Sequence, residues 1–122
     1  MTLKELYQDI GGDYDQAIRI MRAEKLIQKH ICKLPKKGVV DALLAAGETM
    51  DPTQLFEASH AVKGIASNLG LASFAAAVSE ISEEFRPGAG RTMSDAEVKD
   101  KIAGIGATYQ KMVDCINRYE AG

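Results

Sequence analysis

The sequence predicts an all-α fold: an antiparallel, up-and-down bundle of four main helices with a short extra helix at the N-terminus. Apolar residues recur at intervals of three and four along nearly all of the 122 residues, which is the period of an amphipathic helix. No stretch alternates apolar and polar residues as a strand would, and no Asn-Gly hairpin turn occurs. Capping residues, glycines and prolines divide the chain into segments of helical length.

The chain opens with a short helix and a longer helical segment. Thr2 and Glu5 form a capping box in front of a helix over residues 3–10, which ends at Gly11. Residues 14–34 carry apolar side chains throughout, but their stripe changes face along the segment. A bend in this segment and a straight helix that changes packing partners would both explain the drift.

Two further helices follow the break that Pro35 imposes on the chain. The first is short and is expected to end near Gly47, because glycine commonly follows a helix end. The second begins with the N-cap Asp51 and with Pro52 at its first position, and Gly70 is its expected left-handed end. Its buried stripe comprises apolar and small residues at helical spacing: Leu55, Ala58, Ser59, Val62, Ile65, Ala66 and Leu69.

The last two helices fill the rest of the chain. A helix over residues 71–85 ends at Pro87, and Ser94 begins the final helix with a second capping box. The seam of the final helix alternates steps of three and four: Val98, Ile102, Ile105, Tyr109, Met112, Ile116 and Tyr119. Gly104 and Gly106 lie inside this helix, and either close packing against a neighbour or a local irregularity would explain them.

Length, composition and charge are those of a soluble, single-domain protein. One domain suits 122 residues, and 46% hydrophobic with 26% charged residues is an ordinary globular composition. The 15 Lys and Arg against 17 Asp and Glu give a net charge of −2, which argues against a nucleic-acid partner. The chain has no apolar run long enough to span a membrane and no signal-peptide centre. Because Cys32 and Cys115 are interpreted as reduced thiols, we expect a cytoplasmic protein.

The candidate site lies on the helix over residues 52–69, on the face opposite its buried stripe. At about 100° per residue, His60 points roughly 160° away from Val62, the centre of that stripe. Its neighbours on the same face are an aromatic residue, a cation, a glycine and a hydroxyl: Phe56, Lys63, Gly64 and Ser67. A glycine on a solvent-facing helix surface costs about 1 kcal/mol relative to alanine. Close approach of another molecule to the imidazole would explain it.

These residue types suit a phosphoryl acceptor. An imidazole has an unperturbed pKa of about 6.5, so much of it is neutral and nucleophilic near pH 7. Lys63, one turn from His60, disfavours the imidazolium and can pair with phosphoryl oxygens after transfer. Phe56 offers apolar contact area to a docking partner, although it would equally suit the edge of the bundle. An exposed histidine on a helix is more often an ordinary surface residue, so the neighbours carry the argument.

Residues 59–70, SHAVKGIASNLG, resemble the signature of histidine phosphotransfer (HPt) domains, which is H-x-x-K-G, small residues and then N-L-G. Six positions match: His60, Lys63, Gly64, Asn68, Leu69 and Gly70. The opening amphipathic segment, the small-residue helix after the motif and the long final helix are also similar to the family's layout. Ile65 and Ser82 stand where the family often has Ser and Glu, and neither position touches the acceptor.

The resemblance implies a phosphocarrier without its own nucleotide site rather than an enzyme. His60 would accept a phosphoryl group on Nε2 from an aspartate of a receiver domain and pass it to another. Lys63 would stabilise the phosphoryl charge, and Phe56, Gly64 and Ser67 would lie in the docking surface. The partners would be receiver domains of response regulators or hybrid histidine kinases, which would supply Mg²⁺. The carrier itself would need no cofactor or metal and would be a monomer. The sequence accordingly has no G-x-x-x-x-G-K-[ST] loop.

Two other functions fit an exposed helix face. A non-catalytic helical binding module would use it to dock or sequester a receiver domain or another partner. A metal-binding bundle is the weaker idea, because His30 and Cys32 lie two residues apart and diverge by about 200° on a helix.

Charged clusters elsewhere are expected to be solvated. Lys33, Lys36 and Lys37 surround Pro35, where a solvated loop is the ordinary interpretation and binding of an acidic surface the weaker one. The expected acidic face consists of Glu80, Glu83 and Glu84.

Overall fold

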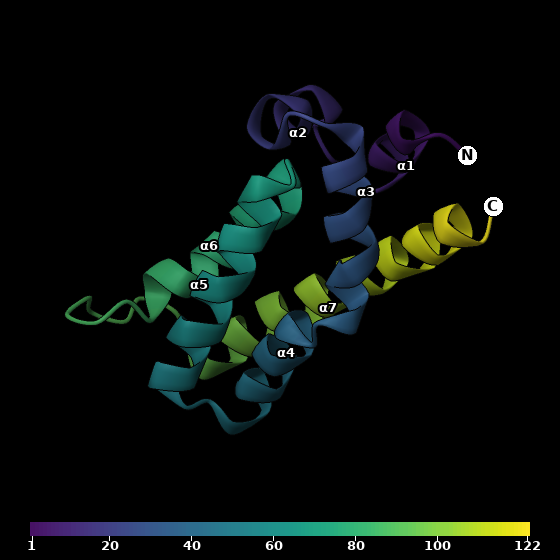
Figure 1. The fold of residues 1–122 in the computed structure, drawn as a ribbon. Helices are drawn as coiled ribbons and strands as arrows, with labels where there is room; N and C mark the ends of the chain where they lie inside the picture. Colours follow the sequence, from purple (N-terminus) through teal and green to yellow (C-terminus); the bar gives the residue numbers. More distant parts are fainter.

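The computed structural model describes residues 1–122 and is helical throughout, without a strand (Figure 1). Its elements are α1 (Leu3–Asp9), α2 (Tyr14–Met21), α3 (Glu24–Lys33), the 3-10 turn η1 (Leu34–Lys36), α4 (Val39–Thr49), α5 (Pro52–Asn68), α6 (Ala72–Glu84) and α7 (Asp95–Ala121). The predicted all-α class is confirmed. Helix α5 packs between α4 and α6, and α7 contacts both α4 and α6. Helices α1 and α3 also contact α7, and α2 contacts the outer side of this group at α5.

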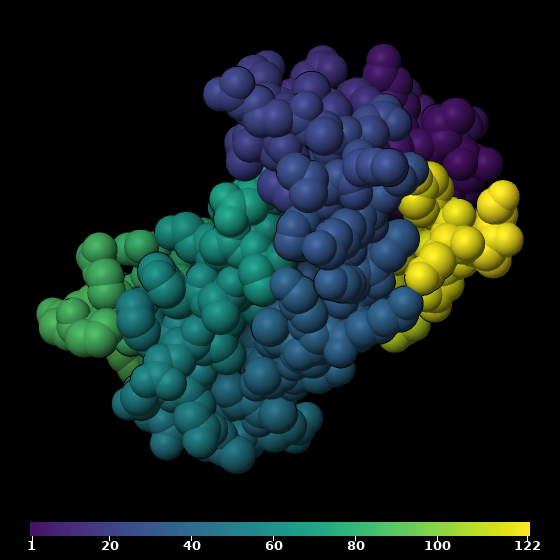
Figure 2. Space-filling model, in the orientation of Figure 1, coloured from purple at the N-terminus to yellow at the C-terminus, as the bar shows by residue number.

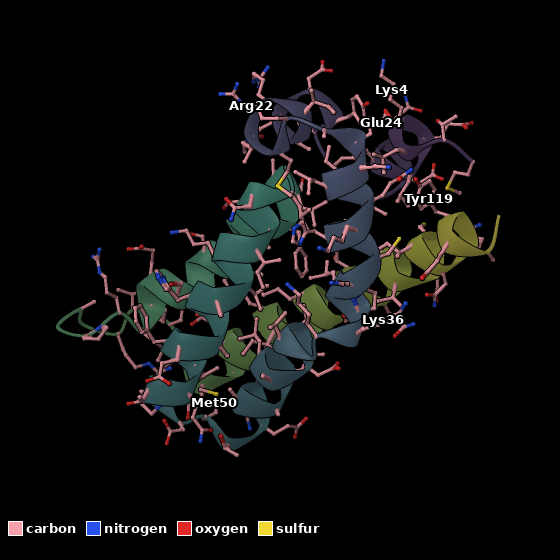
Figure 3. The ribbon with its side chains drawn as sticks, in the orientation of Figure 1. Lys4, Arg22, Glu24, Lys36, Met50 and Tyr119 are labelled. Atoms are coloured by element: carbon pink, nitrogen blue, oxygen red, sulfur yellow. The ribbon has the colours of Figure 1, made fainter.

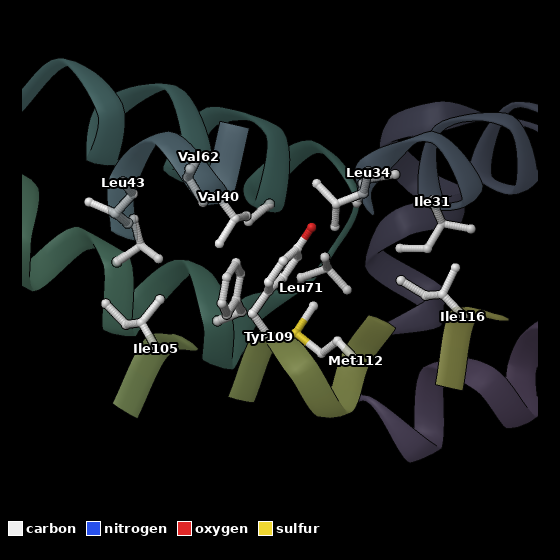
Figure 4. Packing of buried hydrophobic residues seen from close by; sticks show 14 of the residues in the cluster. Ile31, Leu34, Val40, Leu43, Val62, Leu71, Ile105, Tyr109, Met112 and Ile116 are labelled. Carbon is white, nitrogen blue, oxygen red and sulfur yellow. The ribbon is translucent and has the colours of Figure 1, made fainter. Parts of the chain in front are cut away.

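One cluster of 26 buried hydrophobic residues runs through the molecule, with members from every helix. Figure 4 shows Tyr109 and Met112 of α7 facing Val40 of α4 and Leu71 of the turn before α6. The predicted seam of α7 is buried from Val98 to Ile116, and only its last member, Tyr119, is half-buried. Burial of this stripe is the main stabilising contribution to a helix that is polar on its other side.

The segment over residues 14–34 is two helices, not one. Arg22 adopts a left-handed conformation with φ 73°, and the chain turns there from α2 into α3 (Figure 3). The Tyr14 hydroxyl donates a hydrogen bond to the Glu24 carboxylate across this break, which raises the pKa of Tyr14 to about 12. A bend therefore explains the drifting apolar stripe, because each helix has its own buried face.

The helix after Pro35 ends two residues beyond Gly47, close to the expected position, but the expectation that the glycine ends the helix is wrong. Helix α4 continues to Thr49 and ends at Met50, which is left-handed with φ 57° (Figure 3). Gly47 is buried inside the helix, where a Cβ atom would lie 2.9 Å from Cδ1 of Ile102. The glycine is therefore a point of close contact with α7 and not a helix end.

The expected end of α5 at Gly70 is confirmed, and it is held by the N-terminal helices. Gly70 has φ 67°, and its carbonyl accepts a 2.7 Å hydrogen bond from the backbone N–H of Asp13. One residue earlier, the Leu69 carbonyl accepts a 2.6 Å hydrogen bond from the buried Tyr7 hydroxyl. These contacts connect α1 and the start of α2 to the helix that carries the candidate site.

The two glycines of the last helix have different surroundings. Helix α7 is unbroken over 27 residues, so a local irregularity does not account for them. A Cβ atom at Gly106 would lie 3.2 Å from Cδ2 of Leu44, which fits close packing against α4. A Cβ atom at Gly104 would meet nothing within 4 Å, and nothing in the packing explains this residue.

The expected acidic face on α6 is wrong for one of its members. Glu84 is buried, and its carboxylate accepts hydrogen bonds from the backbone N–H groups of Met93 and Thr92, at 2.7 and 2.8 Å, and from the Thr92 hydroxyl. The Arg91 guanidinium lies 3.6 Å away. The hydrogen bonds from Met93 and Thr92, with the Arg91 charge, hold the pKa of Glu84 below its usual value. This side chain fixes the loop that joins α6 to α7.

Candidate functional site

Local signals in the sequence position α5 and decide which side of it faces solvent. The Asp51 side chain accepts a 3.0 Å hydrogen bond from the backbone N–H of Gln54, and Pro52 follows as the first helical residue. The buried residues of the helix are Leu55, Ser59, Val62 and Ala66. His60 lies on the opposite side and is exposed, as its spacing from Val62 predicts.

The His60 imidazole rests on an aromatic ring. The rings of Phe56 and His60 are stacked, with centroids 5.5 Å apart and planes inclined by 21°. Phe56 is half-buried and packs against the core, so it is a fixed platform one turn before the histidine. His60 makes no hydrogen bond and no ion pair with the rest of the chain. Its ring nitrogens are therefore accessible to another molecule, while one face of the ring is covered.

Gly64 leaves open space one turn after the histidine. The residue is exposed, and a Cβ atom placed on it would meet nothing within 4 Å. At Gly47 and Gly70, by contrast, a Cβ atom would come within 3.0 Å of other parts of the chain. The packing of this chain thus does not require glycine at position 64, and none of its own loops fills the space.

Lys63 is half-buried, where the facing of the helix predicts an exposed side chain. Long side chains commonly lay their apolar stems along a surface while the charged end stays in water. The Lys63 ammonium has no ion-pair partner in the chain, whereas Lys36, Arg86, Arg91 and Lys101 are paired with carboxylates. It is a free cation one turn from His60. Ser67, the last residue assigned to this face, is exposed.

Ser59 has a structural role beside the acceptor. It is fully buried, and its hydroxyl donates hydrogen bonds to the Leu55 and Phe56 carbonyls, at 2.6 and 3.1 Å. Serine in a helix commonly satisfies its hydroxyl in this way. The residue therefore needs no partner outside the helix, and it belongs to the packing against the core.

Sequence reasoning missed a hollow next to this face. It lies between the end of α2, α3, the turn after η1 and the C-terminal part of α5, and its volume is about 210 Å³. We call it the α3–α5 hollow, and it is lined by Met21, His30, Lys37, Ile65, Asn68 and Leu69. Ile65, assigned to the buried stripe of its helix, is half-buried at this wall. The side chains come from four places along the chain, between residues 21 and 69, so no local spacing could have indicated them.

Other candidate sites find no support in the geometry. No group of three or more His, Cys, Asp or Glu side chains lies close enough to hold a metal ion. Cys32 and Cys115 are both free thiols, and burial together with the nearby Glu120 raises the pKa of Cys32. None of the helices combines the length and the hydrophobicity needed to cross a bilayer.

Comparisons with models of protein families, with known proteins and with solved structures find no match to this chain. The functional conclusion therefore rests on residues 59–70 and on the geometry of α5.

Proposed function

We propose that this protein is a histidine phosphotransfer protein, which relays a phosphoryl group between aspartates of receiver domains through a phosphohistidine at His60. One observation carries the proposal: the imidazole is exposed on α5, stacked on Phe56, next to a glycine over which the space is open. The HPt-like motif over residues 59–70 supports the same conclusion, because its histidine, lysine and glycine are the residues that line this face.

The transfer step needs a neutral imidazole and an activated phosphoryl donor. The lone pair on Nε2 of His60 attacks the phosphorus of an aspartyl phosphate on the receiver. The N–P bond forms, and the P–O bond breaks with its electron pair leaving on the aspartate carboxylate. The imidazole proton stays on Nδ1 during this step. Attack by an aspartate of a second receiver on the phosphohistidine reverses the sequence and regenerates the carrier.

Neighbouring residues divide the remaining tasks. Lys63 stabilises negative charge on the phosphoryl oxygens as a point charge. Phe56 holds the imidazole plane, and Gly64 and Ser67 admit the edge of the receiver that carries the aspartate. The receiver supplies Mg²⁺, and the carrier needs no nucleotide, metal or cofactor of its own. It is accordingly a carrier and not an independent kinase.

The proposal also covers the arrangement of the helices, the cellular compartment and the oligomeric state. In this proposal, helices α4 to α7 form an antiparallel, up-and-down four-helix bundle. The contacts of each of these helices with two of the others support it. Helices α1 to α3 lie across one end of it. Two free thiols and no disulfide suit a cytoplasmic protein, which would act as a monomer.

Transfer from a receiver tests the proposal. The protein is incubated with a phosphorylated receiver domain from the same organism and Mg²⁺, and the phosphoryl label is followed. We expect acid-labile, alkali-stable label on the wild type and none on His60→Gln. Because His60 is exposed and makes no hydrogen bond, the free energy of unfolding of this variant should differ from that of the wild type by less than about 0.5 kcal/mol. Thermal denaturation checks this.

The other outcomes separate the alternatives. Equal labelling of His60→Gln would reject His60 as the acceptor. Stable binding of the receiver with no label on the wild type would identify a non-catalytic module that sequesters the receiver.

A further inference from the structure

Positive charge is concentrated in one segment of this acidic chain. Six of its 15 Lys and Arg residues lie between Arg22 and Lys37, together with one of its 17 acidic residues, Glu24. This segment comprises the break before α3, α3 itself and the turn after it, so the net charge of −2 conceals a basic segment. In Figure 2, α3 and α5 share one face of the molecule, with the dark blue of α3 next to the teal of α5.

Most of these cations are not used within the chain. Lys36, at the end of η1 (Figure 3), pairs with Glu120 of α7 at 2.9 Å. No ion pair engages Lys33 or Lys37, and both are exposed. Unpaired charges clustered on a surface produce a local field that attracts an oppositely charged partner.

The α3–α5 hollow lies at the edge of this basic segment. Its polar lining consists of His30, Lys37 and Asn68, all of which can donate hydrogen bonds, and no carboxylate lines it. Its remaining lining is apolar. With about 210 Å³, it is smaller than the sites of about 300–1,000 Å³ that take drug-sized ligands. The hollow therefore suits one side chain that carries a negative charge.

The hollow and the candidate acceptor are close enough for one partner to reach both. Asn68 follows His60 by eight residues on the same helix, which is about 12 Å along its axis and about 80° around it. Gly64 lies between them with open space over it. On α3, Leu26 is 44% exposed one turn before His30 and offers a further apolar contact to a partner. Charged groups beside an exposed apolar residue are typical of a protein interface.

We propose that the α3–α5 hollow is a second contact for the receiver that docks on His60, and that it receives an Asp or Glu side chain from an acidic face of that receiver. This inference rests on the proposed function. Lys37 and His30 donate to the carboxylate, and Lys33 steers the encounter. A nucleic acid is the less favoured occupant, because the hollow holds one group and the chain as a whole is negative, whereas nucleic-acid binding needs several phosphate contacts.

Charge reversal at Lys37 tests the hollow. The rate of phosphoryl transfer to His60 is measured against receiver concentration for the wild type, Lys37→Glu and a matched control, Lys111→Glu. Lys111 is exposed on α7, a helix that does not line the hollow. We expect Lys37→Glu to raise the half-saturating receiver concentration about tenfold with an unchanged maximal rate. Lys37→Gln should give a smaller change in the same direction, and Lys111→Glu should match the wild type.

A small donor separates the two proposals. Phosphoramidate needs no docking surface, so all four proteins should be labelled on His60 at equal rates. No label on the wild type from either donor would overturn the proposed function. Normal labelling of the wild type, with Lys37→Glu indistinguishable from Lys111→Glu against the receiver, would overturn the hollow alone. Binding of a labelled DNA duplex or RNA strand that is lost in Lys37→Glu, with receiver kinetics unchanged, would assign the surface to nucleic acid instead.

Discussion

His60 and His30, the two histidines of the chain, have different surroundings. His60 is exposed, stacked on Phe56 and open to approach over Gly64. His30 is half-buried in the wall of a hollow, and it stacks on no aromatic ring. A nucleophile needs free access to one ring nitrogen and a fixed ring plane, and only His60 has both. We therefore assign His60 to phosphoryl transfer and His30 to binding of the partner.

Gly64 can be tested against a glycine with the same local environment. Gly64 and Gly104 are both helical and exposed, and a Cβ atom at either would meet nothing within 4 Å. We expect Gly64→Gln and Gly104→Gln each to raise the free energy of unfolding, by up to about 1 kcal/mol, because glycine is a poor helix former. Only Gly64→Gln should slow phosphoryl transfer from a receiver, by at least about tenfold, because its side chain occupies the approach to His60. Equal transfer rates for the two variants would show that nothing approaches over Gly64.

Lys63 is expected to act on the phosphoryl group and not on the fold. Lys63→Ala should slow transfer or shorten the lifetime of the phosphohistidine, because it removes the only free cation one turn from His60. Lys63→Arg keeps the charge and should retain part of the rate, and Lys99→Ala on α7 serves as the control. Transfer kinetics and the decay of the label measure these effects. Unfolding of Lys63→Ala at ambient temperature would show that its half-buried stem matters more than its charge.

Helix α5 shows which local structure could be predicted from the sequence. Its start at Asp51 and its end at Gly70 were predictable, because capping and left-handed glycine are local signals. The break between α2 and α3 falls at Arg22, which is neither glycine nor proline, so no residue marked it. Gly47, in contrast, is a glycine that does not end its helix. Its small size allows close contact with Ile102, which lies 55 residues away in the sequence.

Gly70 should tolerate no side chain. Gly70→Ala would place a residue with a Cβ atom at φ 67° and bring that atom within 2.6 Å of the Asp13 carbonyl oxygen. A left-handed alanine costs about 1–2 kcal/mol even without overlap. We expect the free energy of unfolding in urea to fall by at least about 2 kcal/mol, as for other strained positions. A variant as stable as the wild type would mean that the end of α5 is not held against the start of α2.

The loop between α6 and α7 should be sensitive to acid through Glu84. Because the pKa of Glu84 is lowered in the folded protein, its ionisation stabilises the fold above the ordinary value near 4.5. This contribution is lost as the pH falls through the lowered pKa. We therefore expect Glu84→Gln to be less stable than the wild type at pH 7, with the difference shrinking towards low pH. Urea unfolding of both proteins across that range measures it, with exposed Glu83→Gln as the control. A difference that is independent of pH would contradict the assignment.

At the scale of the whole molecule, the fold class could be predicted from the sequence, but the contacts between distant parts of the chain could not. The all-α class followed from the period of its apolar residues, and the exposed face of α5 followed from the spacing of His60 and Val62. The α3–α5 hollow could not be predicted, because it forms only when α2, α3 and α5 come together. The burial of Glu84 was equally hidden, since its hydrogen-bond donors belong to a loop that the helical period does not describe.

The distribution of charge is also a property of the folded molecule. The total charge argued against a nucleic-acid partner, whereas the structure places a basic segment, residues 22–37, next to the helix that carries His60. Electrostatic attraction of this kind acts mainly on the rate of encounter and weakens with salt. Local charge therefore says more about the partner than the sum over the chain.

The position of the phosphoryl group on the protein decides whether His60 is the acceptor. The wild-type protein is phosphorylated with phosphoramidate or with a phosphorylated receiver, and the modified residue is identified by tandem mass spectrometry and phosphorus NMR under alkaline conditions. We expect a single phosphoryl group on Nε2 of His60, with His30 unmodified. A phosphoryl group on His30 or on a hydroxyl, or an unmodified His60 in the presence of an active donor, would contradict it.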